Sequence, residues 1–205
     1  MTHATINHVV FDIGRVLLHY DPQIPFSRII PDEDDRRWFF ENVCTHDWNV
    51  EQDRGRGWRE AEELLIEEHP DHVENIRAFR SNWHEMVPHA YEGSVDIMRG
   101  LIRSGHDVTM LTNFASDTFR EVVDRFDFLS ETRGVTVSGD VGVIKPQREI
   151  YDTHVTSFAL EPAATLFIDD SPANVEGARA AGWKAVHFAG AENLASQLEG
   201  LGVKY

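Results

Sequence analysis

The chain has 205 residues, of which 41% are hydrophobic, so it can bury a full core as one domain or as one domain with an insertion. Its formal net charge of −16 argues against nucleic acid and membranes as partners, because nucleic acid and anionic lipid surfaces are themselves negatively charged. The lone cysteine, Cys44, excludes an internal disulfide and fits a reducing compartment, so we expect a cytoplasmic location.

The first part of the chain predicts one strand followed by helices. The apolar run His8–Phe11 ends at Asp12, just before Gly14, and a buried strand that ends in this way presents a carboxylate suited to a nucleophile or a metal ligand. From Pro31 to about Val87, apolar residues recur at three- and four-residue spacing, which is typical of helices. Because this segment follows the first strand and precedes the second, we expect it to lie as a lid above the carboxyl ends of the strands.

From Glu92 onward, expected helices and strands alternate. The expected elements are a helix to Ser104, a strand at 106–111, a helix at 115–126, extended pieces around 134–144, a helix at 147–158, a strand at 164–168, a helix at 172–181, a strand at 184–188 and a final helix. Strands separated by helices of this length imply right-handed crossovers and a parallel sheet. The sequence therefore predicts an α/β fold with a doubly wound parallel sheet, whose core comprises residues 1–18 and 88–205, and an inserted helical cap of residues 19–87.

Three further polar signals follow the first strand in the sequence. They are Thr112-Asn113 at the end of a second apolar run, Lys145-Pro146 before an amphipathic helix, and Asp169-Asp170 at the end of a third apolar run. Open parallel sheets build their sites at the carboxyl ends of strands, so we expect these segments to form one crevice with Asp12. Structural roles remain as alternatives, since Asp12 and Asp170 could cap helices and Lys145 could end an ordinary loop.

In this order, Asp12-Ile13-Gly14-Arg15-Val16-Leu17, Thr112-Asn113, Lys145-Pro146 and Asp169-Asp170 resemble the four motifs of the haloacid dehalogenase-like (HAD) superfamily. The resemblance covers nearly the whole chain, and the helical insert is similar to the small lid of one subgroup. Members of the superfamily are mostly phosphatases that use an aspartate nucleophile and magnesium. The resemblance therefore implies a hydrolase with a Rossmann-like HAD core and a bound Mg²⁺.

The resemblance also implies a role for each motif residue. Asp12 would attack phosphorus, and Mg²⁺ would be bound by Asp12, Asp170 and the Gly14 carbonyl. Lys145 would neutralise phosphate charge and hold Asp12 in place. The transferring group would accept hydrogen bonds from Thr112 and from the Asn113 backbone. Asp169 would orient Lys145 or a metal-bound water, and Asn174 would hold metal-bound water. For each of these two residues, a purely structural role is the alternative. Lys145 would thus supply the local positive charge that an acidic protein needs for an anionic substrate.

One position departs from the family pattern. Most phosphatases of this type have a second Asp two residues after the nucleophile, which protonates the leaving oxygen, whereas this chain has Gly14. General acid catalysis contributes roughly 10²–10⁴-fold, so its loss predicts a slower enzyme, or one that takes the proton from water, substrate or the lid. Arg15 cannot act as an acid and is either a phosphate contact or an exposed turn residue. This pattern resembles sugar-phosphate phosphatases that lack the second Asp.

The segment from Trp48 to Gly55 is the candidate for a lid loop that touches substrate, because it mixes an aromatic residue, polar groups and a glycine between helices. The alternative is a solvated turn with Trp48 in the lid core. The tryptophans at 38, 58 and 83 are expected to serve in packing.

The leading functional interpretation is a Mg²⁺-dependent phosphomonoester hydrolase that acts on a small phosphorylated metabolite, such as a sugar phosphate, through an aspartyl-phosphate intermediate. One alternative is a metal-independent 2-haloacid dehalogenase, against which the adjacent carboxylates Asp169 and Asp170 argue, because a metal-free site for an anionic substrate has no use for them. The other is a non-catalytic relative that binds a phosphorylated ligand or a partner protein. Gly14 keeps that alternative open, and the intact motif residues argue against it.

Overall fold

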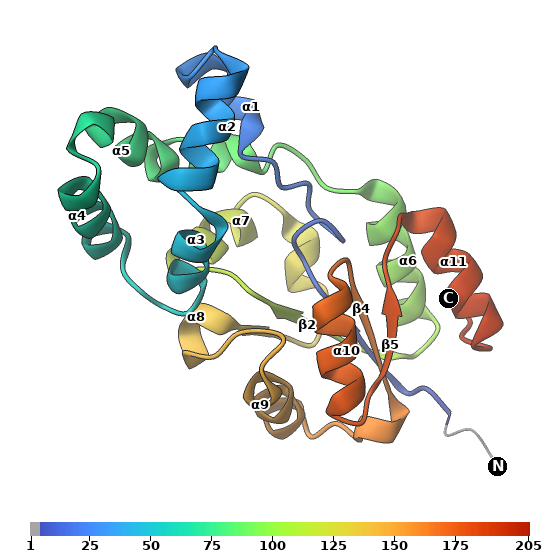
Figure 1. Ribbon diagram of the computed structural model, residues 1–205. Helices are drawn as coiled ribbons and strands as arrows, with labels where there is room; N and C mark the ends of the chain where they lie inside the picture. Colours follow the sequence, from blue (N-terminus) through green and yellow to red (C-terminus); the bar gives the residue numbers. More distant parts are fainter. Residues whose placement is uncertain (1–4) are drawn as a thin grey trace.

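The computed structural model describes residues 5–205, so the first four residues of the expected core lie outside the described part. Five strands form one parallel sheet in the order β3-β2-β1-β4-β5 (Figure 1). The strands are β1 (His8–Phe11), β2 (Asp107–Thr112), β3 (Val135–Val137), β4 (Thr165–Asp169) and β5 (Lys184–His187). The predicted α/β fold with a parallel sheet is confirmed, and β1 lies at its centre between β2 and β4.

Alternating side chains of the strands pack into two apolar clusters, one on each face of the sheet. Val10 of β1 packs in the cluster that includes α9 (Arg148–Phe158) and α10 (Pro172–Ala180). Val9 and Phe11 point the other way, into the cluster of α6 (Glu92–Arg103), α7 (Ser116–Val123) and α11 (Ala191–Gly200). Helices therefore cover both faces, as a doubly wound sheet requires.

Five α-helices lie between β1 and α6 in the sequence, and we call α1 to α5 the inserted helices. They are α1 (Gln23–Ile29), α2 (Glu33–Asn42), α3 (His46–Asp53), α4 (Trp58–Glu68) and α5 (Val73–Ser81), with short 3₁₀ helices η1 (Pro70–His72) and η2 (Trp83–Met86). Figure 1 shows them grouped beyond the carboxyl ends of the strands. The division of the chain into a core of 1–18 and 88–205 and a cap of 19–87 stays a prediction.

The inserted helices pack around an aromatic cluster. The rings of Phe26 and Phe39 stack with centroids 5.5 Å apart, and those of Trp58 and Phe79 with centroids 5.9 Å apart. These residues belong to the same apolar cluster as one face of the sheet, so the inserted helices share a continuous core with the α/β part. Shared burial of this kind holds the inserted helices close to the site.

Several local expectations differ from the structure. Helix α1 begins at Gln23, before the expected start of the helical pattern at Pro31. Its Pro25 is tolerated because a proline in the first turn of a helix costs no hydrogen bond. Residues 48–53, expected as a lid loop or turn, belong to α3, whose N-terminus is capped by the Thr45 side chain. Only 135–137 of the expected extended region is a strand, and α8 (Ser138–Val141) follows at once.

The expected packing roles of the tryptophans hold in two of three cases. Trp58 and Trp83 are buried, whereas Trp38 is 46% exposed and lies against the His72 ring at the surface. The expectation for Trp38 is therefore wrong, because its helical spacing places it beside the apolar stripe of α2 rather than on it.

Cys44 is buried, and burial raises the pKa of its thiol, which disfavours a reactive thiolate.

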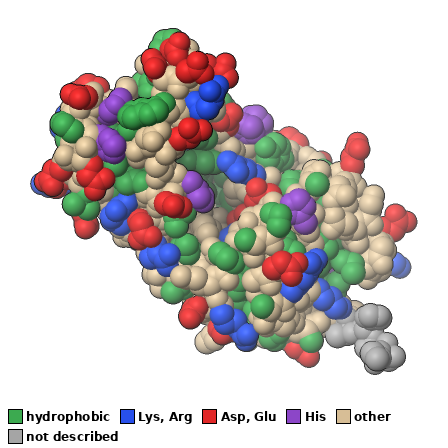
Figure 2. Space-filling model, viewed as in Figure 1, with side chains coloured by type: hydrophobic (Ala, Val, Ile, Leu, Met, Phe, Trp, Pro, Cys, Tyr) green, Lys and Arg blue, Asp and Glu red, His purple; other side chains and the backbone are tan. Residues whose placement is uncertain are grey.

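Within residues 5–205, no helix combines the length and the hydropathy needed to cross a membrane. Figure 2 shows acidic side chains spread over the visible face, which is hollowed between the inserted helices and the α/β part.

Candidate active site

Three carboxylates meet at the carboxyl ends of the two central strands. Phe11 of β1 pairs in register with Ile168 of β4, so Asp12, the next residue after Phe11, lies level with Asp169. Oxygen atoms of Asp12, Asp169 and Asp170 all lie within 4.8 Å of one another. Asp12 and Asp169 are buried and Asp170 is partly exposed, so this acidic cluster opens to solvent on the Asp170 side.

Lys145 lies between two of these carboxylates. Its ammonium nitrogen is 2.7 Å from Asp12 Oδ1 and 2.7 Å from Asp169 Oδ2, and its side chain is 1% exposed. The Asn113 side chain fixes the backbone of Lys145, since its Nδ2 donates to the Lys145 carbonyl at 3.0 Å and its Oδ1 accepts from the Lys145 N–H at 2.8 Å. The second and third predicted motifs are thus joined directly, through an amide pairing that the sequence did not indicate.

Asp169 is the most heavily bonded of the three carboxylates. Besides Lys145, it accepts from the Ser171 backbone N–H at 2.8 Å and from Asn174 Nδ2 at 3.0 and 3.2 Å. Asn174, in the first turn of α10, therefore lies against Asp169. Because both Asp169 oxygens already accept hydrogen bonds, Asp12 and Asp170 are the carboxylates with oxygen atoms left for another ligand.

The remaining motif residues surround this cluster. Thr112 ends β2 and is 1% exposed. Gly14 lies in the turn after β1, and among residues 5–205 no hydrogen bond ends on its carbonyl oxygen. Arg15 is exposed with a φ of 60°, and its guanidinium lies 5.9 Å from the centre of the Tyr20 ring. Burial and Asp169 raise the pKa of Asp170, and the Arg15 charge opposes that rise. Arg15 thus combines an exposed turn position with an electrostatic effect on the site.

Burial dominates the electrostatics of the cluster. It raises the pKa of Asp12 to about 7, against the lowering effect of Lys145, and together with Asp169 it raises the pKa of Asp170. Burial would lower the pKa of Lys145, but Asp12 and Asp169 outweigh it and raise that pKa. With all three carboxylates ionised, the site would hold more negative charge than Lys145 alone compensates, and raised pKa values of this kind are typical of a functional site rather than of an ordinary core.

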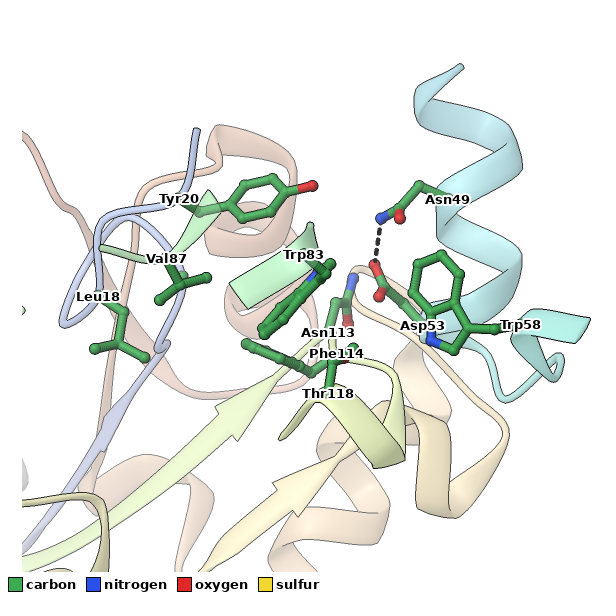
Figure 3. Close-up of a pocket in the computed structure, with 11 residues that line it drawn as sticks. Leu18, Tyr20, Asn49, Asp53, Trp58, Trp83, Val87, Asn113, Phe114 and Thr118 are labelled. Atoms are coloured by element: carbon green, nitrogen blue, oxygen red, sulfur yellow. Dashed lines mark hydrogen bonds between the residues drawn. The ribbon is translucent and has the colours of Figure 1, made fainter. Parts of the chain in front are cut away.

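A cavity lies beside the cluster, between the inserted helices and the sheet (Figure 3). Its lining residues are Gly14, Leu18, Tyr20, Asn49, Asp53, Trp58, Trp83, Val87, Asn113, Phe114 and Thr118. Its volume of about 90 Å³ would hold roughly six waters, taking about 15 Å³ for each, so it suits a small group. The sequence predicted no site role for Tyr20, Trp58 and Trp83. An aromatic residue can line a cavity or pack in the core, and its type alone does not distinguish the two.

Asp53, the last residue of α3, supplies a carboxyl group to this cavity (Figure 3). The Asn49 side chain donates to its Oδ2 at 3.5 Å, and the Ser138 hydroxyl donates to its backbone carbonyl. Burial raises the pKa of the Asp53 carboxyl to about 7, against the opposing effects of a hydrogen bond from the Ala115 backbone and of the Lys145 charge. The segment that we expected to be a substrate-facing loop therefore reaches the cavity as the end of a helix.

A model of haloacid dehalogenase-like hydrolases matches residues 56–188, well over half of the chain. The protein belongs to the haloacid dehalogenase-like hydrolase family. This confirms the resemblance drawn from the four motifs and identifies the protein as a hydrolase.

Solved structures of this HAD hydrolase family share the fold. A predicted HAD-like family hydrolase from Porphyromonas gingivalis is 20% identical with a TM-score of 0.72, over 98% of this chain and 100% of that chain. A HAD family enzyme from Bacteroides thetaiotaomicron, in complex with magnesium and inorganic phosphate, is 18% identical with a TM-score of 0.66, over 89% and 93%. The L-2-haloacid dehalogenase from Xanthobacter autotrophicus, with chloropropionic acid covalently bound, is 19% identical with a TM-score of 0.64, over 96% and 83%.

Proposed function

We propose that this HAD hydrolase is a Mg²⁺-dependent phosphomonoester hydrolase that acts on a small phosphorylated metabolite, such as a sugar phosphate, through an aspartyl-phosphate intermediate. The observation that carries the proposal is the cluster of Asp12, Asp169 and Asp170 around the buried ammonium of Lys145. When ionised, three carboxylates and one ammonium leave two negative charges. A divalent cation would neutralise them before a phosphate dianion approaches.

The donor atoms suit magnesium. Asp12, Asp170 and the Gly14 carbonyl would hold the ion, because Asp169 already accepts hydrogen bonds on both of its oxygens. These are hard oxygen ligands, few in number, as Mg²⁺ prefers when it keeps several waters. When bound, the ion would supply positive charge that reduces the repulsion between the attacking carboxylate and the phosphate. The magnesium and phosphate bound by the Bacteroides thetaiotaomicron enzyme are consistent with this assignment.

The residues of the chain would carry the two chemical steps. An Asp12 carboxylate oxygen attacks phosphorus, the bond to the leaving oxygen breaks, and an acyl phosphate forms. Water then attacks the same phosphorus, which releases inorganic phosphate and restores the Asp12 carboxylate. Lys145 fixes Asp12 and compensates phosphate charge, while the Thr112 hydroxyl and the Asn113 backbone N–H donate to the transferring group.

One solved structure of the same fold supports the dehalogenase alternative, since the Xanthobacter autotrophicus enzyme carries covalently bound chloropropionic acid. The acidic cluster favours the phosphatase. A metal-free site for a 2-haloacid would place the substrate carboxylate near Asp12 and Asp170 with Lys145 as the one buried cation of the cluster, and like charges would repel.

The test is an assay of p-nitrophenyl phosphate and a panel of sugar phosphates with Mg²⁺ and with a chelator. Turnover should vanish in the chelator and return with Mg²⁺. Asp12→Asn should abolish turnover, and Asp170→Asn should weaken Mg²⁺ binding measured by titration calorimetry, while both variants keep the wild-type circular dichroism. An exposed carboxylate supplies the control, Asp127→Asn, which should change neither quantity. Full turnover in chelator, or release of halide from a 2-haloacid without metal, would contradict the proposal.

A further inference from the structure

The position that lacks the expected acid has room for one. A side chain built at Gly14 would meet no atom within 4 Å of its Cβ, and the Gly14 backbone lies outside the left-handed region that favours glycine. Neither packing nor backbone conformation therefore requires glycine there. Gly14 lines the cavity beside the acidic cluster, and the same cavity is lined by a carboxyl group, that of Asp53.

Asp53 is held in place by residues of the α/β part. The Ser138 hydroxyl donates to the Asp53 backbone carbonyl, and the Ala115 backbone contributes a hydrogen bond to the Asp53 carboxyl group. The next residue, Arg54, donates to Gln147 Oε1 at 3.0 Å. A carboxyl group at the end of an inserted helix is therefore fixed relative to the α/β part, in which Asp12 follows β1, as proton transfer requires.

The surroundings of Asp53 favour the protonated carboxyl group. Trp58, Trp83 and Phe114 give the cavity apolar walls, and burial is the main cause that raises the pKa of Asp53 to about 7. A carboxylic acid with a pKa near neutrality is suited to give up a proton during turnover and to take one back.

We propose that Asp53 is the general acid and base of this phosphatase, donating from the inserted helix α3 the proton that an aspartate at position 14 would otherwise supply. This inference rests on the proposed phosphatase function. As Asp12 attacks phosphorus, the phosphorus–oxygen bond to the leaving group breaks and the leaving oxygen takes the Asp53 proton. In the second step the Asp53 carboxylate takes a proton from the water that attacks the acyl phosphate, so Asp53 and Asp12 return to their starting forms.

Leaving-group chemistry provides the test. An aryl phosphate expels a stable anion, whereas an alkyl phosphate expels a basic alkoxide that must be protonated. In single-turnover assays, Asp53→Asn should slow glycerol 2-phosphate and glucose 6-phosphate by about 10²-fold or more, and p-nitrophenyl phosphate by less than about threefold. Asp47→Asn removes an exposed carboxylate from the same helix and should leave both rates unchanged.

Restoring an acid at Gly14, which also lines the cavity, separates catalysis from structure. In the Asp53→Asn background, Gly14→Asp should recover at least about tenfold of the alkyl-phosphate rate, because Gly14 lines the same cavity and has open space around its Cβ position. In the wild-type background, Gly14→Asp should change the ratio of alkyl to aryl rates by less than about threefold, since a proton donor is already present. The second comparison holds even if Asp53→Asn does not fold.

The outcomes distinguish this inference from the function on which it rests. Equal slowing of both substrates by Asp53→Asn, no slowing of either, or a large gain from Gly14→Asp alone would overturn the role of Asp53 and leave the phosphatase intact. A wild type that hydrolyses no phosphomonoester with Mg²⁺ would remove the proposed function and this role with it.

Discussion

Lys145 is the residue on which the candidate site depends most. It is the buried cation between Asp12 and Asp169, at 2.7 Å from each, and its backbone is fixed by Asn113. A buried ion pair adds little when compared with apolar replacements of both partners, but removing one partner leaves an uncompensated charge. The fold therefore needs the Lys145 side chain for stability, because without it the surrounding carboxylates would be buried with no compensating charge.

Lys145→Met should therefore destabilise the protein and abolish phosphatase turnover together. We expect the free energy of unfolding, measured in urea with a chelator present, to fall by about 3–5 kcal/mol. Lys204→Met is the matched control on an exposed lysine and should change that free energy by less than about 0.5 kcal/mol. Wild-type stability of Lys145→Met would mean that Asp12 and Asp169 are not held as ions by this lysine.

His154 joins three elements away from the site. Its Nε2 lies 2.9 Å from the Thr109 hydroxyl of β2 and its Nδ1 2.8 Å from the Thr136 hydroxyl of β3, while the residue itself belongs to α9. The ring is fully buried, and burial lowers its pKa to about 3. A neutral histidine thus links the β2–β3 edge of the sheet to the helix that covers it.

This arrangement predicts loss of stability in acid. In the unfolded chain His154 binds a proton below its ordinary pKa of 6.5, whereas in the folded protein it binds one only near pH 3. The contribution of neutral His154 to the free energy of unfolding is therefore complete above pH 6.5 and is lost as the pH falls toward 3. The slope should reach about 1.4 kcal/mol per pH unit. His154→Gln should be less stable at pH 7.5 but should lose stability less steeply between pH 6.5 and 4, measured by urea unfolding. The exposed-site control, His46→Gln, should keep the wild-type slope; equal slopes in all three proteins would contradict the account.

The sequence predicted most elements because their apolar patterns are local. The runs that end at Asp12, Thr112 and Asp169 became adjacent parallel strands, and the order of the motifs placed their ends at one edge. The expectation of a loop from Trp48 onward was wrong because polar residues there suggested exposure, whereas the Thr45 cap and the burial of Gln52 stabilise a helix. Burial of a polar side chain depends on tertiary contacts that no local pattern contains.

The candidate site was partly predictable for the same reason. Strand register brings Asp12 beside Asp169, so their proximity followed from the expected sheet. The pairing of Asn113 with the Lys145 backbone, and the place of Asp53 in the cavity, required knowledge of how segments far apart in the sequence pack together. The metal-binding and catalytic roles of the motif residues stay predictions.

At the scale of the whole molecule, the cavity exists because the inserted helices dock on the α/β part. Polar contacts join the two parts in addition to the apolar ones. Arg80 of α5 contacts both Asp117 and Glu121 of α7, and the Trp58 indole N–H donates to Asp117 at 3.0 Å. The Arg125 guanidinium donates to the backbone carbonyls of His84 and Val87, where the inserted segment returns. Arg80, Asp117, Glu121 and Arg125 do not line the cavity, so a change at one of them should affect the cavity indirectly.

Arg80→Gln provides the test, because it removes the charge that holds α5 against α7. We expect faster hydrogen exchange in α3 and α7, and a raised KM for p-nitrophenyl phosphate with a smaller change in kcat, since Asp12 and Lys145 are undisturbed. Salt should speed exchange in the wild type, because it screens these partly exposed ion pairs, but should have less effect on Arg80→Gln. Arg77→Gln on the exposed face of the same helix is the control. Wild-type exchange rates in α3 and α7 of Arg80→Gln would mean that apolar packing alone holds the inserted helices in place.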